Sequence, residues 1–567
     1  MRRIGVRVTV LGVLGLALAT ASSAVAADGD LATNFNGTGT LTGTFGSTGA
    51  QLFRGVVQPD GKLVVAGSRE GEGVVARFNP NGTPDASFGI SGTGYTIVDS
   101  GATTGGERLR AVALQGNQIL AVGDASISGG SDFVLARLNS DGNLDNSFDG
   151  PGAPGNGVFR INAGAGTNAS GSAIAADGTG LVFGGSVDQH PLVYRLTDTG
   201  ALDTTFNTTG HMTFDFPGAG TSFLSGLAVQ PSDSKIIAVG RANNISSGIG
   251  VARITTGGLL DTSGFASPNG VVSLTPPTGY MGGAGADVAF GPSGQILVVG
   301  FLTSSSGPPF GRDPAIAAVT SAGALDTAGF GAGTGYAVIP LPGQFDQAGG
   351  IAVQPDGKLL IGGSAGDSGT TDFLAARFSS TGVLDTSFAA PTGYTTTDIG
   401  GTAQTGTGVT LSGTGVAYVA GTAGSSNFGI AAYQAVPPAP PTLTGTDPGS
   451  GADNNNPKVI GAADPGTTVS LFTNAGCTGP PAASGSASSF ASPGLAVSVA
   501  DNSTTTFHAT ASWDGGTSAC SASSVTYAEV TPPPQSSTAQ PTQSAKKKCK
   551  KHKKRSAAAS KKCKKKK

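Results

Sequence analysis

The chain has very few of the residues that build most catalytic and metal sites. Its 567 residues include four histidines, four cysteines, three methionines and one tryptophan. The histidines are far apart in the sequence, so neither a histidine metal site nor a histidine-assisted nucleophile has a local pattern. Phosphate loops, dinucleotide fingerprints and zinc spacings are missing as well. We therefore assign no catalytic, cofactor-binding or metal-binding residue and expect no cofactor. The composition favours a non-enzymatic protein, and an enzyme is the alternative.

Charged and aromatic residues are also scarce, at 12% and 6% of the chain, whereas glycine is abundant with 93 residues. This composition excludes a long helical protein and favours many short strands joined by tight turns. After the N-terminal segment, no apolar run is long enough to cross a bilayer, which takes about 20 residues. The sequence predicts an all-β protein with no transmembrane segment in the mature chain.

The first residues have the three parts of a secretory signal peptide. Arg2, Arg3 and Arg7 form a basic start, residues 8–18 are apolar, and residues 24–26 are a small-residue cleavage motif. A retained membrane anchor is the alternative, but the apolar stretch is short for one. We expect residues 1–27 to be removed and the mature protein to be secreted.

One segment recurs seven times along most of the chain. Each copy has a hairpin that ends at a small-residue step, and these steps lie 55 to 63 residues apart at Gly67, Gly123, Gly185, Gly240, Gly300, Gly363 and Gly421. In the first copy, residues 55–58, 63–66, 74–78 and 94–98 read as strands, with a Pro-Asp-Gly-Lys turn at 59–62. Four strands in about 59 residues are typical of one propeller blade.

The two ends of the repeat array complement each other. The last copy stops at Gln434 and lacks its final loop and fourth strand. Residues 29–35 match residues 200–206 position by position, and 37–45 can supply the missing strand. These observations predict a seven-bladed β-propeller over 28–434, closed by N- and C-terminal strands, because closure removes exposed sheet edges. An open solenoid is the rival, but it would not need complementary halves.

The repeats resemble a known family. The segments "VVQPDGKLVVAGSREGEGVVARFNPNGTPDASFG" and "IAVQPDGKLLIGGSAGDSGTTDFLAARFSSTGVLDTSFA" look like the delta-60 repeat family of secreted bacterial proteins. Those proteins are regarded as β-propellers of uncharacterised function. The resemblance implies the same fold and carries over no catalytic residue.

An arginine and an aspartate recur eight residues apart. The pairs are Arg77 and Asp85, Arg137 and Asp145, Arg195 and Asp203, Arg253 and Asp261, and Arg377 and Asp385. Both are lost together in the closing blade, as Ala432 and Ala32, whereas blade five has Ala318 facing Asp326. Joint loss predicts direct contact, since a lone buried charge is costly. We interpret the pairs as loop supports; a ring of ligand-binding carboxylates is the alternative.

Other acidic residues lie in segments where a metal or catalytic site could form. Residues 79–85 and 139–145 resemble fragments of calcium loops, but other copies lack the carboxylates, so plain Asx turns fit better. Four acids lie outside the repeated turn and are the places where an enzyme would gather its carboxylates: Asp99, Asp215, Asp287 and Asp346.

A different module follows the repeats. Prolines at 435–441 predict a semi-rigid linker, and short alternating strands over 442–530 predict a β-sandwich. The stretch "PTLTGTDPGSGADNNNPKVIGAADPGTTVSLFTNAGC" resembles bacterial immunoglobulin-like modules, which usually act as stalks or adhesion units. Because export places them in an oxidising compartment, Cys477 and Cys520 are expected to pair; two free thiols are the alternative.

The chain ends in a Lys-rich tail, 531–567, whose composition predicts disorder. Fourteen of the 33 basic residues lie after Gln543 and three in the signal peptide, which leaves 16 bases against 35 acids in the body. This split does not indicate a specific nucleic-acid binder; it predicts that the tail binds anionic cell-envelope polymers. Lipid head groups and a merely solubilising role are alternatives, and the states of Cys549 and Cys563 stay open.

Together these patterns predict an exported, non-enzymatic, cell-surface-associated protein. Its propeller would bind a protein or glycan ligand in adhesion or scaffolding, and its cationic tail would retain it on the envelope. The alternative is a secreted propeller enzyme that acts on polysaccharide or another extracellular substrate.

Overall fold

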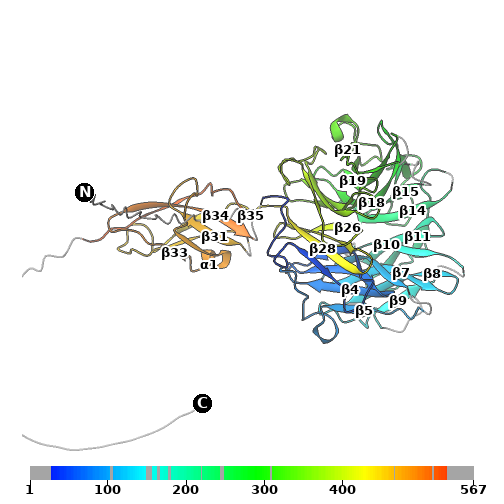
Figure 1. Ribbon diagram of the computed structural model, residues 1–567, viewed down its shortest axis with the longest axis horizontal. Coiled ribbons are helices and arrows are strands. Elements are labelled where there is room, and N and C mark those ends of the chain that lie inside the picture. Colours follow the sequence, from blue (N-terminus) through cyan, green and yellow to red (C-terminus); the bar gives the residue numbers. More distant parts are fainter. Residues whose placement is uncertain are drawn as a thin grey trace, which may run out of the picture.

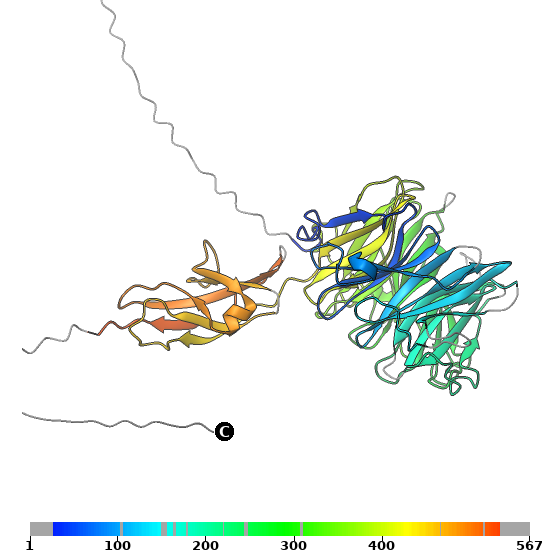
Figure 2. The ribbon, with the colours of Figure 1, turned by 90° about the horizontal axis from the view of Figure 1, so that it is seen from below.

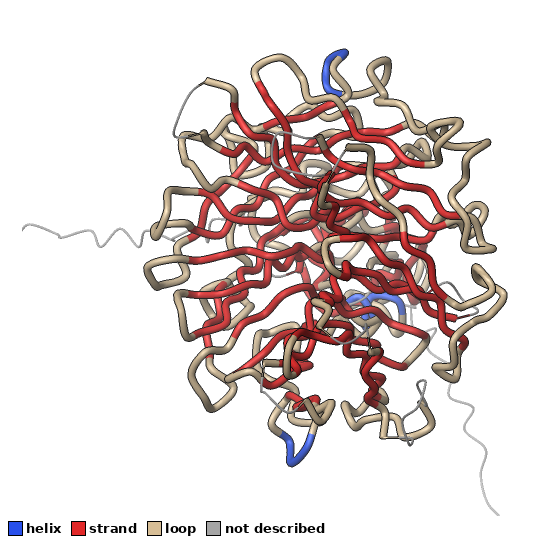
Figure 3. The backbone as a smooth tube through the Cα atoms, turned by 90° about the vertical axis from the view of Figure 1, so that its right-hand side faces the viewer, coloured by secondary structure: helices blue, strands red, loops and turns tan. Residues whose placement is uncertain are grey.

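A computed structural model describes residues 27–102, 106–148, 156–162, 166–176, 180–218, 220–242, 248–306, 310–464, 467–513 and 516–532. The expected signal peptide, except Ala27, and the tail after Pro532, with Cys549 and Cys563, lie outside these residues. Strands make up nearly all the regular structure of the described part, as Figure 3 shows. The all-β prediction is therefore confirmed. None of the helices in this part is long and apolar enough to cross a membrane.

Between Thr40 and Gln434, the described strands form seven antiparallel four-stranded sheets, which we number as blades along the chain. Blade one contains β2 (Gln51–Val57), β3 (Leu63–Arg69), β4 (Glu72–Phe78) and β5 (Tyr95–Val98). Blade two contains β6 (Glu107–Gln115), β7 (Gln118–Ile127), β8 (Gly130–Leu138) and β9 (Val158–Ile161). Blade three contains β10 (Ala169–Ala176), β11 (Gly180–Val187), β12 (His190–Thr197) and β13 (His211–Thr213).

The remaining blades follow the same order. Blade four contains β14 (Ser222–Val229), β15 (Ile236–Ala242), β16 (Ile249–Ile254) and β17 (Val271–Leu274). Blade five contains β18 (Tyr280–Phe290), β19 (Ile296–Ser304), β20 (Arg312–Val319) and β21 (Tyr336–Val338). Blade six contains β22 (Gln347–Val353), β23 (Leu359–Ala365), β24 (Asp372–Phe378) and β25 (Tyr394–Thr397). Blade seven combines β26 (Gln404–Leu411), β27 (Val416–Ala423) and β28 (Asn427–Gln434) with β1 (Thr40–Gly43). The loops include two short 3-10 turns, η1 (Ile90–Gly92) and η2 (Gly331–Gly333).

The first strands of the blades form a closed ring around the centre. Each of β2, β6, β10, β14, β18, β22 and β26 contacts the first strand of the next blade, and β26 returns to β2. Apolar side chains of neighbouring blades pack against each other in shared clusters. The second and third strands of a blade are therefore buried on both faces, which explains why nearly all their residues are apolar.

The N-terminal segment completes blade seven, as the sequence predicts. Strand β1 pairs with β28, with Thr40 opposite Ala431 and Gly43 opposite Phe428. Ala32 N donates to Ala432 O at 2.9 Å, in the positions where other repeats hold arginine and aspartate. Figure 1 shows this N-terminal segment in dark blue near the yellow strand β28.

A β-bulge explains the repeated glycine. All seven first strands shift register near their middle. A β-carbon on the repeated glycine of the second strand would overlap a carbonyl oxygen that lies just before this bulge. The glycine and carbonyl pairs are Gly67 and Gln51, Gly123 and Arg108, Gly185 and Ser170, Gly240 and Phe223, Gly300 and Ala284, Gly363 and Gln347, and Gly421 and Thr405. The small residue is needed for close backbone approach.

The C-terminal part has two sheets that share one hydrophobic core. One sheet contains β29 (Thr442–Asp447), β30 (Lys458–Ala462) and β33 (Leu495–Ala496). The other contains β31 (Thr468–Phe472), β32 (Ala483–Ser486), β34 (Thr504–Trp513) and β35 (Gly516–Thr517), and β36 (Val525–Ala528) pairs with β34. A short helix, α1 (Ala487–Ala491), follows β32. Figure 2 shows this module as a folded unit distinct from the blades; its immunoglobulin-like identity stays a prediction.

Candidate binding face

The ring has two faces with different sequence character. In an antiparallel blade, the first turn and the last loop lie at one end of the sheet. We call this end the motif face, because it carries the turns like residues 59–62 and the loops like residues 79–94. The opposite end, the variable face, carries the turns between second and third strands and the links to the next blade. These segments differ from blade to blade, so a site specific to one part of the ring can form there.

The repeated arginine and aspartate are in direct contact on the motif face. The distance from arginine Nε to aspartate Oδ2 is 2.7 Å for Arg77 and Asp85 and 2.7 Å for Arg377 and Asp385. The pairs in blades two, three and four, of Arg137, Arg195 and Arg253 with their aspartates, have distances of 2.8, 3.4 and 2.8 Å. The predicted contacts are confirmed in all five blades.

Each arginine also joins its blade to the next one. Arg77 Nη1 donates to Ser140 O of blade two at 2.5 Å, and Arg253 Nη1 donates to Ser321 O of blade five at 2.6 Å. Arg377 Nη1 donates to Asp28 Oδ2 and to Ala435 O, both at 2.7 Å. The last of these arginines therefore holds the N-terminal segment that completes the ring, which supports the interpretation of a structural role.

A lysine of the first turn or of its end completes three of these clusters, in blades one, four and six, and this contact was not predicted from the sequence. Lys62, Lys235 and Lys358 place their ammonium groups 3.0 Å from the aspartates of their blades. Burial alone would raise the pKa of Asp85, but hydrogen bonds from Ser87 and Lys62 and the charge of Arg77 outweigh it and hold this pKa far below its usual range. Asp85 is thus a fully engaged anion rather than a free ligand-binding group. The lysine that ends each Pro-Asp-Gly-Lys turn was the sequence feature from which this contact could have been predicted.

The Asn- and Asp-rich loops of the motif face form Asx turns. Asn81 Oδ1 accepts from Thr83 N at 3.1 Å, and Asp141 Oδ1 accepts from Asn143 N at 3.0 Å. The plain-turn interpretation is confirmed by these contacts. Among the described residues, no group of three acidic, histidine or cysteine side chains could hold a metal ion.

An ion pair crosses the central channel. Arg54 of β2 reaches Asp287 of β18, with 3.0 Å between Nη1 and Oδ1, and its Nη2 donates to Ala286 O at 2.5 Å. Both side chains are about one-fifth exposed. The cavity beside them has a volume of about 160 Å³ and is otherwise lined by glycine and aliphatic residues such as Gly55, Ile174 and Val409. Arg54 lies at a bulge and has no counterpart in the other repeats, so the repeat pattern could not reveal the contact.

The four blade-specific acids have separate partners. Asp287 pairs with Arg54, and Asp99 Oδ1 accepts from Gly101 N at 2.8 Å. Asp215 contacts His190 Nδ1 at 2.8 Å, with both side chains half exposed. Asp346 is fully buried, and its Oδ1 accepts from Gly366 N at 2.6 Å. They lie in links and strands of different blades and form no carboxylate pair with one another.

Blade five holds the larger cavity, of about 550 Å³, on the variable face. Tyr280, Ser304, Ser306 and Asp313 line it together with residues 340–344. Tyr280 donates to Asp313 Oδ2 at 2.7 Å, and Leu341 N donates to Asp313 Oδ1 at 3.1 Å. Burial and the neighbouring Asp313 raise the pKa of Tyr280 well above its usual range, so its hydroxyl stays protonated. Sequence reasoning missed this pair, because Tyr280 and Asp313 lie 33 residues apart on different strands.

Asp346 lies behind this cavity. Its Oδ2 is buried without a hydrogen-bond partner, and burial, with the charge of Asp313 as a lesser cause, raises its pKa. Glu107, the first residue of β6, has the equivalent position in blade two, and its Oε1 accepts from Ser100 N at 2.8 Å. Burial also raises the pKa of Glu107. The shared position indicates that both acids brace the link between two blades.

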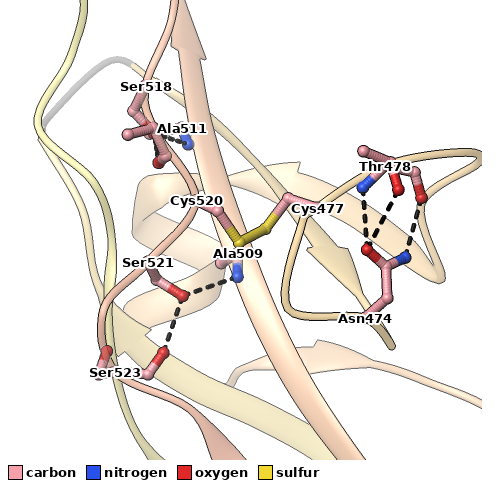
Figure 4. Close-up of a disulfide and its surroundings, with 10 residues drawn as sticks. Asn474, Cys477, Thr478, Ala509, Ala511, Ser518, Cys520, Ser521 and Ser523 are labelled. Carbon is pink, nitrogen blue, oxygen red and sulfur yellow. Dashed lines mark hydrogen bonds between the residues drawn. A yellow bond between two sulfur atoms is a disulfide. The ribbon is translucent and has the colours of Figure 1, made fainter.

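The C-terminal module contains the expected disulfide between Cys477 and Cys520, shown in Figure 4. Cys520 lies between two serines that hydrogen-bond to β34. Ser518 Oγ accepts from Ala511 N at 2.9 Å, and Ser521 Oγ accepts from Ala509 N at 3.0 Å. The disulfide therefore ties the loop after β31 to the segment that runs along β34.

Comparison with known proteins agrees with the propeller architecture. Residues 58–88, 117–148, 232–263 and 354–388 match the family described as "Domain of unknown function (DUF5122) beta-propeller". These four segments match the propeller repeat of that family, which is consistent with the delta-60 resemblance. A search of curated proteins finds no match.

Three solved structures similar to this chain have low sequence identity to it. The virginiamycin B lyase of Staphylococcus aureus is 11% identical with a TM-score of 0.40, over 69% of this chain and 98% of that chain. The polysaccharide lyase Uly1 is 11% identical with a TM-score of 0.36, over 67% and 89%. The aldose sugar dehydrogenase of Streptomyces coelicolor is 13% identical with a TM-score of 0.32, over 69% and 98%. At these values no substrate or site carries over to this chain.

Proposed function

We propose that this chain is an exported, non-enzymatic binding protein. Its propeller presents the variable face to a ligand, the C-terminal module acts as an immunoglobulin-like stalk, and the Lys-rich tail holds the protein on anionic polymers of the cell envelope. The tail carries 14 basic residues and no acid after Gln543, so counterion release favours such binding.

The residues that line the cavity of the central channel are the main support for a non-enzymatic function. Of the residues that line its cavity, Asp287 is the one acid, and the guanidinium of Arg54 neutralises it. General acid and base catalysis needs a group that can exchange a proton near neutral pH. The carboxylate of Asp287 is already held by the guanidinium of Arg54, and the other residues that line this cavity are glycine and aliphatic residues.

A secreted enzyme acting on polysaccharide is the second candidate, and the cavity of blade five is the feature that favours it. Tyr280 and Asp313 lie together there at 2.7 Å, within reach of a bound substrate. The raised pKa of Tyr280 opposes a role as a base, because the phenol keeps its proton at neutral pH.

The test compares the mature full chain with a chain ending at Pro534 for binding to isolated envelopes across a salt series. We expect the full chain to bind at low salt and to be released as salt rises, and the shortened chain to bind much less. Equal, salt-independent binding of both chains would contradict retention by the tail and would assign recognition to the folded modules.

A further inference from the structure

Two arginines on the variable face differ from the others in the ring. Of the twelve arginines in the described residues, nine form ion pairs with a carboxylate. The remaining three are Arg108, Arg241 and Arg312. Arg108 is exposed, so water can hydrate its charge, whereas Arg241 and Arg312 are partly buried. A partly buried guanidinium without a counterion is unusual, because burial of an unpaired charge is costly.

Both guanidinium groups are held in place by aromatic rings. The Cζ atom of Arg241 lies 4.7 Å from the ring centre of Phe223, in the neighbouring strand of blade four. The Cζ atom of Arg312 lies 4.5 Å from the ring centre of Phe301 and 5.9 Å from that of Phe345. Stacking on a ring fixes the plane of a guanidinium and leaves its N–H edges free to donate.

Few of these N–H groups have a partner. Arg241 Nε is buried with no hydrogen-bond partner, and Arg312 has one long contact, 3.4 Å from Nη1 to Gln347 Oε1. Burial and, secondly, the positive charge of Arg241 lower the pKa of Arg312, so the two charges are close enough to repel each other. An anion placed beside them would supply the missing acceptors and cancel the repulsion.

The residues around Arg241 and Arg312 indicate which class of anion would fit this site. Phe345 and Phe310 are 38% and 46% exposed, which gives the site apolar ring faces open to solvent. The cavity of about 550 Å³ adjoins Arg312, because its sequence neighbours Gly311 and Asp313 line it. A volume of this size is typical of small-molecule sites. Its hydroxyl and carboxylate groups suit the hydroxyls of a sugar, and Asp313 disfavours a ligand with densely packed negative charge.

From this arrangement we propose that the variable face of blades four to six binds an acidic polysaccharide, with Arg241 and Arg312 holding the carboxylate of a uronic acid unit. Phe345 packs against the apolar face of a sugar ring, and the cavity around Tyr280 and Asp313 receives the hydroxyls of the adjoining unit. This inference deepens the proposed function, since it rests on a propeller that binds rather than cleaves its ligand.

The experiment measures the binding of short oligogalacturonates at about 0.15 M salt, where long-range electrostatics is screened. Oligomers of galactose serve as the neutral match, since they lack the carboxylate, and polyglutamate serves as a polyanion without sugar. Each measurement is made on the full chain and on a chain ending at Pro534, because the tail itself attracts polyanions. We expect the shortened chain to bind oligogalacturonate tightly and to bind neither galactose oligomers nor polyglutamate.

The variants are Arg241→Gln, Arg312→Gln and the matched control Arg108→Gln, which removes an equal charge from an exposed position on β6 of the same face. Loss of a charge-assisted contact predicts affinity about tenfold lower for the first two variants and nearly unchanged for the control. Arg312→Lys keeps the charge but loses the planar fork, so we expect its affinity to fall as well. If an arginine variant fails to fold, Phe345→Ala replaces it, with affinity about threefold to tenfold lower.

Each other outcome overturns a defined part of the account. Equal binding of galactose oligomers, of polyglutamate, or of all variants including Arg108→Gln would overturn the uronic acid site. If no oligosaccharide binds while envelope binding still depends on the tail, the site is wrong and the proposed function stands. Cleavage of oligogalacturonate by the wild-type chain would instead overturn the proposed non-enzymatic function.

Discussion

Arg377 offers the sharpest test of how the ring is held together. Its side chain is 1% exposed, and it contacts Asp385, Asp28 and Ala435 at 2.7 Å each. Removing one member of a buried ion pair typically costs about 3–5 kcal/mol, because the other charge stays buried. Lys358 and Ser387 still contact Asp385 after the change, so we expect Arg377→Ala to lower the free energy of unfolding by about 3 kcal/mol, the lower end of that range.

The chain supplies two comparisons for this variant. The pair of Arg195 and Asp203 has the same place in blade three but is 16% and 19% exposed, with a longer contact of 3.4 Å. Because this pair is more exposed and its contact is longer, Arg195→Ala should cost less than Arg377→Ala, about 1 kcal/mol. The closing blade has alanine at both positions, so Arg377→Ala combined with Asp385→Ala should cost clearly less than the sum of the single changes, by about 2 kcal/mol.

Urea unfolding followed by far-ultraviolet circular dichroism measures these effects, since most of the strands lie in the ring. The fluorescence of Trp513, the one tryptophan, reports the C-terminal module separately and should not change. Similar losses for Arg377→Ala and Arg195→Ala, or strictly additive effects of Arg377→Ala and Asp385→Ala, would refute the reasoning.

Three further predictions concern pH, the bulge and the disulfide. The native pKa values of Asp85 and Asp385 lie below the unfolded value of about 3.9, so their stabilisation is present above that pH and is lost below it; the melting temperature should fall as pH drops from about 5 to about 2. Burial raises the pKa of Asp346, so ionisation of this carboxyl destabilises the folded wild type as pH rises. Asp346→Asn cannot ionise, so thermal unfolding should show this variant becoming more stable relative to the wild type from about pH 4 to pH 8. A stability difference that does not change with pH would contradict this. Gly240→Ala should cost about 1–3 kcal/mol through overlap with Phe223 O, whereas Gly413→Ala, with open space around it, should be nearly neutral in the same assay. Reducing the disulfide of Cys477 and Cys520, which encloses 43 residues, should destabilise the module by about 2–5 kcal/mol without shifting the unfolding of the ring.

The architecture was largely predictable because its signals repeat. Residues 29–35 match residues 200–206, and the paired loss of arginine and aspartate at Ala432 and Ala32 pointed to direct contact; the structure places these two alanines side by side. A pattern present in most blades describes what every blade must do to pack against its neighbour. The repeat pattern was therefore enough to predict the fold and the contacts between arginine and aspartate on the motif face.

The candidate site was not predictable by the same means, because it depends on residues that occur once. Arg241 and Arg312 lie in different blades, 71 residues apart in the chain, and only the ring brings their charges near each other. Arg54 and Asp287 likewise meet across the channel from blades one and five. No local spacing in the sequence predicts such contacts. Of the four acids singled out from the sequence, Asp287 forms an ion pair with Arg54, and Asp346 is buried in the link between blades five and six.

Residues 28–50 close the ring, and the variable face can hold a site built from several blades only if the closed ring fixes those blades. Deleting residues 28–50 removes β1 and the buried rings of Phe35 and Phe45, and thermal unfolding measures the result against the matched chain ending at Pro534, which keeps every described contact. A closed ring predicts a melting temperature lower by about 10 °C or more for the N-terminal deletion and an unchanged melting temperature for the control. An unchanged melting temperature after the N-terminal deletion would contradict the closed ring.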